Sequence, residues 1–315
     1  MIYVFMGGRL GNQLFRYACA RALQVKYPDQ MIVLDFERIA KHREIEADYL
    51  SSLLDFQIAP CSIINNSRPF HQPYNKVCRF LKKFNNKTKR IGFETPQAFA
   101  LRQRLSPVFE KYNIIDADDY SEINFNGSGD IYIYGCVESE RYFKDISMIL
   151  KSELTPKQDL REKYLPLFQR IRGHEAVCLS VRKWSNLHPE HNSIMGCCDE
   201  TYYKKAIEII NARVANPLFI VFSNDIEWAK NMQIFQENHA EFEPDGLTIG
   251  EKMILMTACK HFVIPNSTFG WWVQYLADYD SKIVIGPDRW NNVCYRNPDL
   301  SLDYFITLPR CSEYE

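Results

Sequence analysis

Residues 2–13 read Ile-Tyr-Val-Phe-Met-Gly-Gly-Arg-Leu-Gly-Asn-Gln, an apolar run that gives way to a glycine turn. Apolar residues then recur at near-helical spacing, at Leu14, Phe15, Ala18, Ala22 and Val25. This order predicts a buried strand, a turn and an amphipathic helix. Such a unit aims main-chain N–H groups at an anion, because the first N–H groups of a helix have no partner within it. Two classes of protein begin in this way.

The first class binds dinucleotides through the fingerprint G-x-G-x-x-G, which here requires glycine at positions 6, 8 and 11. Gly8 and Gly11 comply, but position 6 is Met6. Asp35, at the end of the apolar run 31–34, stands where a ribose-binding acid is expected. A dinucleotide turn packs small residues, whereas this turn carries a guanidinium and two carboxamides, from Arg9, Asn12 and Gln13. A dinucleotide-binding oxidoreductase is therefore an alternative that the turn fits only in part.

The second class is a family of sugar transferases. Gly-Arg-Leu-Gly-Asn-Gln-Leu-Phe-x-Tyr-Ala at 8–18 resembles the opening of the α-1,2-fucosyltransferases, glycosyltransferase family 11. Its Gly-Arg-x-Gly-Asn-Gln form is also similar to the protein O-fucosyltransferases. Residues 135–143 resemble the family block Gly-x-Trp-Gln-Ser-Glu-x-Tyr-Phe, with Val137 in place of Trp and Glu138 in place of Gln.

Further blocks follow in the order of the family. Phe-Ser-Asn-Asp-Ile-Glu-Trp at 222–228 resembles Phe-Ser-Asp-Asp-Ile-Glu-Trp, and 255–272 resembles Leu-Met-Ser-Leu-Cys-Lys-His…Asn-Ser-Ser/Thr-Phe-Ser-Trp-Trp. The family's His-x-Arg-Arg-Gly-Asp corresponds to 180–185, where only Arg182 is kept. The other four positions of this block differ: Ser180, Lys183, Trp184 and Ser185. The resemblance covers roughly residues 2–290.

Apolar strands alternate with helices along the second half of the chain. We expect strands at 176–181, 218–222, 261–264 and 282–285, and helices at 199–212, 251–259 and 269–277. Alternation of this kind predicts an α/β fold with two Rossmann-like halves that face a cleft. The resemblance implies the same architecture, called GT-B. It divides the chain into an acceptor-side domain (1–160), a nucleotide-sugar domain (161–290) and a tail (291–315), for which packing on the first domain is one option.

Composition excludes several classes of function. The chain has 315 residues, 46% of them hydrophobic, and a net charge of −1, which argues against nucleic acid as a partner. No apolar run approaches the roughly 18–20 residues of a membrane span, and Met1 leads directly into the first strand, which predicts no signal peptide. The ten cysteines show no C-x-x-C spacing and are expected to be mostly buried thiols. We therefore expect a cytoplasmic protein.

A basic segment at 76–90 holds seven Lys and Arg residues. It is expected to be a solvated surface, with a wall of an acceptor cleft or a patch for peripheral contact with the inner face of a membrane as alternatives. No oligomeric state is predicted.

The expected donor site lies at strand ends, where open α/β sheets bind ligands. Arg182 offers a two-pronged guanidinium and Lys183 a point charge to a diphosphate. Ser223 and Asp225 either face the nucleotide or, with Asn224, cap the following helix. The remaining donor-binding residues, several of them implied by the resemblance, are Gly8, Arg9, Gly11, Asn12, Asn266, Ser267 and Thr268. Asn12 would hold the fucose or the diphosphate, and the last three would bind phosphate oxygens or ribose.

The reaction implied by the resemblance is transfer of fucose from GDP-fucose to a hydroxyl of a galactose-containing glycan, with inversion and α-1,2 linkage. Arg182 and Asn12 are the expected catalytic residues. No general base is singled out, because positions 180 and 185 are serines; the candidates are Glu138, Asp225, Asp35 and His188. There are two alternatives. The reaction needs no strong base, or the protein is a family member that binds the sugar nucleotide without turning it over.

No metal or other cofactor is expected. His188, His191, Cys197 and Cys198 match no zinc module. The Asp-x-Asp motif at 116–119 is expected to cap a helix. Of the adjacent Trp271 and Trp272, we expect only one in the core, because neighbouring helical residues point in different directions.

Overall fold

The computed structural model describes residues 1–43, 52–65, 96–184, 194–292 and 298–311. Contacts divide the chain into two compact units, one of residues 1–51 and 59–147 and the other of residues 52–58 and 148–315. This division does not test the domain boundaries expected at residues 160 and 290, which stay predictions. The basic segment 76–90 lies outside the described residues.

The first unit is built on a parallel sheet whose strand order is β3-β2-β1-β5-β4. Its strands are β1 (Ile2–Phe5), β2 (Ile32–Asp35), β3 (Ser62–Ile64), β4 (Ile114–Ile115) and β5 (Ile131–Ile133). Ile2 lies opposite Ile32 on one side and Ile131 on the other, so the apolar start of the chain is the centre of this sheet. The expected opening strand is confirmed.

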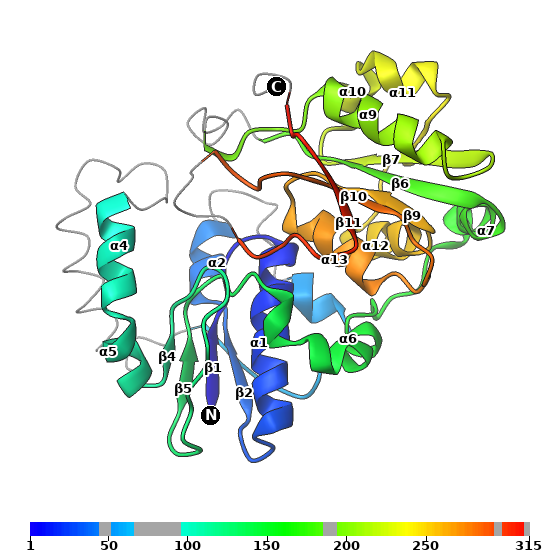
Figure 1. The fold of residues 1–315 in the computed structure, drawn as a ribbon. Coiled ribbons are helices and arrows are strands. Elements are labelled where there is room, and N and C mark those ends of the chain that lie inside the picture. The colour runs from blue at the N-terminus through cyan, green and yellow to red at the C-terminus, as the bar shows by residue number, and fades with distance from the viewer. Residues whose placement is uncertain (44–51, 66–95, 185–193, 293–297, 312–315) are drawn as a thin grey trace. The chain divides into compact units, whose positions relative to one another are not determined.

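The helices of the first unit are α1 (Leu10–Lys26), α2 (Glu37–Arg43), α4 (Pro96–Arg104) and α5 (Ser106–Lys111), with short 3₁₀ helices η2 (Glu140–Tyr142) and η3 (Lys144–Ile146). Helix α1 packs on β1 and β2, and α5 contacts β4 (Figure 1). Leu14, Phe15 and Ala18 of α1 are fully buried, as the amphipathic pattern predicts, whereas Val25 in the last turn is exposed.

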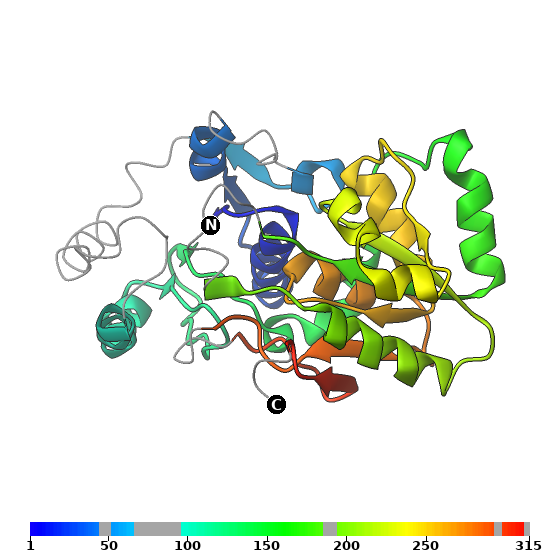
Figure 2. The same ribbon diagram turned by 90° about the horizontal axis from the view of Figure 1, so that it is seen from above.

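The second unit contains a parallel sheet of six strands in the order β11-β10-β9-β6-β7-β8. They are β6 (Glu175–Val181), β7 (Pro217–Ser223), β8 (Glu241–Phe242), β9 (His261–Val263), β10 (Val284–Pro287) and β11 (Phe305–Leu308). Numbered along the chain, this is the order 6-5-4-1-2-3 of the doubly wound nucleotide-binding fold. β11, within the expected tail, pairs with β10 at the sheet edge (Figures 1 and 2).

The helical segments of the second unit are η1 (Ser52–Asp55), α6 (Ser147–Glu153), η4 (Glu162–Tyr164), α7 (Leu165–Gly173), α9 (Glu200–Asn211), α10 (Ile226–Lys230), α11 (Gln233–Glu237), α12 (Ile249–Thr257) and α13 (Thr268–Leu276). In Figure 1, α9, α10 and α11 cover one face of the sheet, and α12 and α13 the other. The two parallel α/β units confirm the expected fold class and its two Rossmann-like halves. The GT-B cleft stays a prediction.

The N-termini of α9 and α12 show how side chains determine where a helix begins. Asp199 accepts a hydrogen bond from the N–H of Tyr202, which confirms it as the N-cap of α9. Helix α12 begins two residues before the expected start, because Thr248 and Glu251 form a reciprocal capping box.

The expectation that only one of Trp271 and Trp272 is buried is wrong, because both are fully buried. Helix α13 is enclosed on all sides from Gly270 to Tyr275, so neither direction leads to solvent. The indole N–H of Trp271 donates to the carbonyl of Leu300 at 2.9 Å, and its ring stacks on Tyr275 at 4.8 Å. These residues belong to the core of the second unit.

Within the described residues, eight cysteines have free thiols, four buried and four half-buried. Burial raises the pKa of the Cys19 and Cys198 thiols. In this part of the chain no helix has both the length and the apolar character needed to cross a membrane.

Candidate active site

The carboxyl ends of three neighbouring strands in the second unit carry most of the expected donor-site residues. β6 lies between β9 and β7, so the segments that begin at Arg182, Asn224 and Ile264 emerge from the same edge of the sheet. In a doubly wound sheet, ligands bind where the strand order reverses, here between β6 and β9. Three sequence blocks that are far apart along the chain therefore meet at the position where this fold binds nucleotides.

Arg182 directly follows β6 and is half-buried. Its guanidinium carbon lies 4.8 Å from the centre of the Trp184 ring. Stacking on an indole orients the planar guanidinium and keeps its charge. Trp184 stands where the resemblance has glycine, so the aromatic support of Arg182 comes from a position at which this chain departs from the motif.

Lys183 ties β6 to β7 through both its main chain and its side chain. The Asn224 side chain accepts from the N–H of Lys183 and donates to its carbonyl, each at 2.9 Å. The ammonium of Lys183 pairs with Asp225 at 2.8 Å. Its charge is therefore already matched by a carboxylate.

Asp225 is the N-cap of α10, which is the capping arrangement considered from the sequence. One carboxylate oxygen accepts from the N–H of Trp228 at 3.0 Å, and the other from Lys183. Lys183, together with this N–H, holds the pKa of the Asp225 carboxyl below its usual range. A carboxylate with both oxygens engaged and a lowered pKa is a poor proton acceptor.

Ser223 is held by two residues that the sequence did not indicate. Its N–H donates to Glu243 at 2.9 Å, and the ammonium of Lys252 donates to its carbonyl at 2.8 Å. Glu243 and Lys252 also pair with each other at 2.7 Å. Glu243 follows the two-residue strand β8, which is too short to leave a sequence pattern.

The turn between β9 and α13 presents hydroxyl groups beside a helix N-terminus. Ser267 is the N-cap of α13, its side chain makes no capping hydrogen bond, and both it and Thr268 are half-buried. Asn266 is buried instead, and its amide nitrogen donates to the carbonyls of Met195, Gly196 and Trp290 at 2.8–3.0 Å. Asn266 thus holds the surrounding loops together, while Ser267 and Thr268 remain at the edge.

The glycine turn of the first unit is shaped by buried side chains of α1. Gly8 has a φ of +74°, and a Cβ there would lie 2.9 Å from the Asn12 Cβ, so only glycine fits. Gln13 donates to the carbonyl of Gly8 at 3.1 Å, and Arg16 donates to that of Gly7 at 2.9 Å. Gln13 therefore supports the turn from inside.

The remaining residues of this turn begin α1. Arg9 is its N-cap, Gly11 is buried in its first turn, and Asn12 is half-buried. The Asn12 amide donates to the carboxylate of Glu138 at 2.8 Å. Glu138 follows β5, which pairs with β1 in the sheet of this unit. The structure thus pairs two residues 126 positions apart in the sequence.

The other candidate bases are placed differently. Asp35 is buried at the end of β2 and accepts the N–H of Glu37 at 2.9 Å. His188 lies outside the described residues, as do Ser185 and His191.

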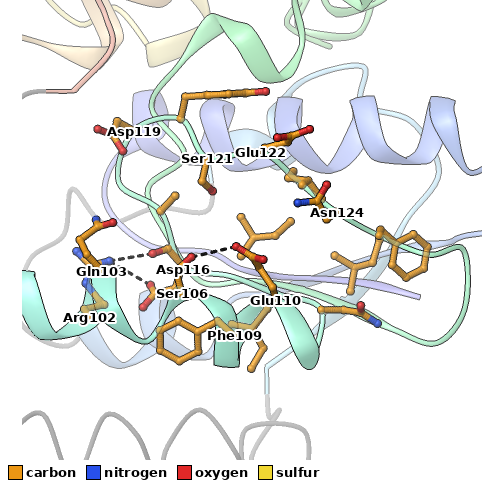
Figure 3. Close-up of a pocket in the computed structure, with 18 residues that line it drawn as sticks. Arg102, Gln103, Ser106, Phe109, Glu110, Asp116, Asp119, Ser121, Glu122 and Asn124 are labelled. Atoms are coloured by element: carbon orange, nitrogen blue, oxygen red, sulfur yellow. Dashed lines mark hydrogen bonds and ion pairs between the residues drawn. The ribbon is translucent and has the colours of Figure 1, made fainter.

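The Asp-x-Asp motif at 116–119 does not cap a helix, so that expectation is wrong. It follows β4, and the buried Arg102 donates to the carbonyl of Asp116 at 3.1 Å and pairs with the carboxylate of Asp118. Figure 3 shows Arg102 beside Asp116 at one side of a pocket lined by α4, α5 and the segment after β4. Among the residues that the structure describes, no group of three or more His, Cys, Asp or Glu is placed to hold a metal ion.

The family model of glycosyl transferase family 11 matches residues 1–297. The chain belongs to this family. WbnK, an O-antigen biosynthesis glycosyltransferase from Escherichia coli, is 26% identical over 98% of this chain and 100% of its own length. An α-1,2-colitosyltransferase from Escherichia coli is 28% identical over 90% of each chain. The alternative of a dinucleotide-binding oxidoreductase is thereby overturned.

Galactoside α-(1,2)-fucosyltransferase 1 from Mus musculus is 30% identical to this glycosyltransferase over 44% of this chain and 40% of its own. A solved structure of the fucosyltransferase NodZ from Bradyrhizobium aligns with a TM-score of 0.48 and 15% identity, over 88% of this chain and 91% of that chain.

Proposed function

We propose that this glycosyltransferase transfers fucose from GDP-fucose to a galactoside hydroxyl, with inversion and α-1,2 linkage. The observation that carries the proposal is the edge of the second sheet, where Arg182 follows β6 and the N-terminus of α13 follows the neighbouring β9. A cation and a helix N-terminus on adjacent strand ends suit the diphosphate of a sugar nucleotide. The names of the mammalian relatives and of the colitosyltransferase support the linkage and the kind of sugar.

Negative charge grows on the departing diphosphate as the sugar passes through an oxocarbenium-like state. In this proposal Arg182 stabilises that charge, and Ser267, Thr268 and the first N–H groups of α13 bind phosphate oxygens. Lys183, Ser223 and Asp225 form the adjoining wall; the first and last are paired with each other. Asn266 acts by holding the loops through its three main-chain acceptors.

In the first unit, the proposal assigns the turn residues Gly8, Arg9, Gly11 and Asn12 to the donor. A cytoplasmic location, peripheral membrane contact, a galactose-containing acceptor and independence from any cofactor stay predictions.

Melting of the protein with nucleotides tests the donor class. GDP should raise the melting temperature, whereas UDP, CMP and NAD at equal concentration should not. A ligand that binds only the folded state contributes about 2.7 kcal/mol at roughly 100 times its Kd, which a melting experiment resolves. Stabilisation by UDP in place of GDP would refute the proposed donor.

Transfer assays then separate the remaining possibilities. GDP release from GDP-fucose should rise when galactosides are added, and the product should carry an α-1,2 bond. GDP-colitose, whose sugar lacks one hydroxyl of fucose, is the second candidate donor because a colitosyltransferase matches 90% of the chain. Faster turnover of GDP-colitose would select it. Binding of GDP without transfer to any acceptor would indicate a family member that has lost catalysis.

A further inference from the structure

The main chain on either side of Arg182 is held by side chains of the second unit. The buried phenol of Tyr203, on α9, donates to the carbonyl of Ser180 at 3.0 Å. The Asn224 side chain bonds both the N–H and the carbonyl of Lys183 at 2.9 Å. Because the main chain is fixed where it leaves β6, the direction of the guanidinium depends on the side-chain torsions of Arg182.

The indole of Trp184 lies against the side chain of Arg182. The guanidinium carbon is 4.8 Å from the centre of the ring, both residues are half-buried, and the indole nitrogen is buried. A cation–π contact is stronger where water is excluded. An aromatic face also orients a guanidinium without placing a negative charge beside it. The contact therefore restricts the torsions of Arg182 and leaves its charge for a ligand.

The orientation of a guanidinium determines how it binds a diphosphate. Its N–H groups form a planar fork, and two parallel hydrogen bonds to phosphate oxygens require that plane to be aligned. Rotation to another rotamer would keep the charge near the end of β6 but break this alignment. A guanidinium that is oriented in advance also avoids the entropic cost of ordering a long side chain as charge develops in the transition state.

We propose that Trp184 is the positioning residue for Arg182 and holds its guanidinium in the plane that binds the departing diphosphate. The assignment rests on the function proposed above. It gives Trp184 no contact with the sugar or with the acceptor, so Trp184 acts through Arg182 alone.

The sequence makes this arrangement a property of the present chain. Arg182 is the one residue kept from the family block at 180–185, and Trp184 stands where that block carries glycine. Glycine has no side chain to stack on a guanidinium. The arginine is thus retained while its support is supplied by a residue that the family block lacks.

A double-mutant cycle between positions 184 and 182 tests the proposal. Trp184→Leu keeps an apolar side chain but removes the aromatic face, so kcat for transfer from GDP-fucose to a galactoside should fall about 3- to 30-fold, the scale of a cation–π contact. In the Arg182→Ala background the same substitution should change kcat by less than about twofold, because the group that Trp184 orients is absent. An equal fall in both backgrounds, or no fall in the wild-type background, would overturn the assignment.

Trp184→Phe is the conservative variant, because phenylalanine restores an aromatic face. It should recover most of the kcat that Trp184→Leu loses, since benzene and indole rings both attract a guanidinium. Equal losses in the two variants would refute a role of the ring. If Trp184→Leu does not fold, Trp184→Met replaces it in the cycle, because methionine is also apolar and has no ring.

Lys183→Ala provides the matched control, because Lys183 precedes Trp184 in the chain but its ammonium pairs with Asp225 at 2.8 Å. Trp184→Leu should lower kcat by the same factor in the Lys183→Ala background as in the wild-type protein, because the two side chains act independently. A coupling as large as that with Arg182 would contradict the proposal, since the effect of the ring would not be specific to the guanidinium.

The wild-type protein and Arg182→Ala separate failure of this assignment from failure of the proposed function. A GDP-induced rise in melting temperature and a large loss of kcat in Arg182→Ala, without coupling between positions 182 and 184, would refute the role of Trp184 alone. Absence of a GDP effect and of any transfer in the wild-type protein would instead refute the proposed function, and this assignment with it.

Discussion

Replacing Arg182 by alanine removes the cation at the end of β6. This variant distinguishes a contribution of Arg182 to kcat from a contribution to folding stability. Loss of one preorganised charge stabiliser costs about 10²–10³ in kcat, or roughly 2.7–4 kcal/mol of transition-state stabilisation. In the folded protein the guanidinium stacks on Trp184 at 4.8 Å, and such a contact at a partly exposed site contributes only about 0.5–1 kcal/mol. We therefore expect a large fall in kcat and a small fall in melting temperature.

Two further variants sharpen this prediction. Arg182→Lys should recover little activity, because an ammonium cannot make the two-pronged contact that a guanidinium makes with a diphosphate. Lys183→Ala is the matched control, since Lys183 is adjacent but already paired with Asp225. This ion pair is about one-third exposed and is worth about 0–1 kcal/mol, so the variant should lose little stability. Because the ammonium of Lys183 is engaged by Asp225, the variant should also lose less activity than Arg182→Ala.

The assay is steady-state release of GDP with and without a galactoside, which yields kcat and KM, accompanied by melting with and without GDP. A folded Arg182→Ala variant that keeps most of the wild-type kcat would refute the role of Arg182. A larger loss in Lys183→Ala than in Arg182→Ala would show that the paired lysine carries the function assigned to the guanidinium.

Three other predictions follow from the geometry. Activity should survive EDTA, because guanidinium and helix N–H groups meet the phosphate charge; loss of turnover that Mg²⁺ or Mn²⁺ restores would contradict this. Gly135→Ala should lower the free energy of unfolding by about 3 kcal/mol or more in urea melts, because its Cβ would lie 1.9 Å from the main-chain oxygen of Ala117. Gly173→Ala, with open space around its Cβ, should be neutral or stabilising, and equal effects of the two variants would refute the steric argument. Arg161 and main-chain N–H groups lower the pKa of Glu251 to about 2 from 4.5, so the stability that this carboxylate contributes is present above pH 4.5 and is lost as the pH falls toward 2. Melting between pH 7 and pH 3 should therefore show a weaker acid dependence in Glu251→Gln than in wild type, and an identical slope would contradict the assignment.

Local sequence pattern was sufficient to predict the apolar strands and the amphipathic helix. The strand, turn and helix of 2–26 are present as expected, and so are the buried strands at 175–181 and 217–223. The strands are continuous apolar runs and the helix follows a helical period, so burial and local geometry favour a single structure. The motifs at their ends were sufficient to indicate the family.

Short elements and side-chain roles were not determined in this way. β4 and β8 have two residues each and form only because a neighbouring strand pairs with them. Asn266, expected from the sequence to bind phosphate oxygens or ribose, donates its amide N–H groups to the carbonyls of residues 195, 196 and 290. The partner of a polar group depends on which remote segment comes to lie beside it.

The sequence by itself thus determined that parallel strands end in cations, hydroxyls and carboxamides. The tertiary structure decided which of these groups meet. Placing β6 between β9 and β7 brings Lys183 to Asn224 and Asp225, and placing β1 beside β5 brings Asn12 to Glu138. Strand order depends on burial across the whole unit, whereas a sequence motif reflects only the residues next to it in the chain. For this reason the partner of each polar group in a motif could be identified only in the folded protein.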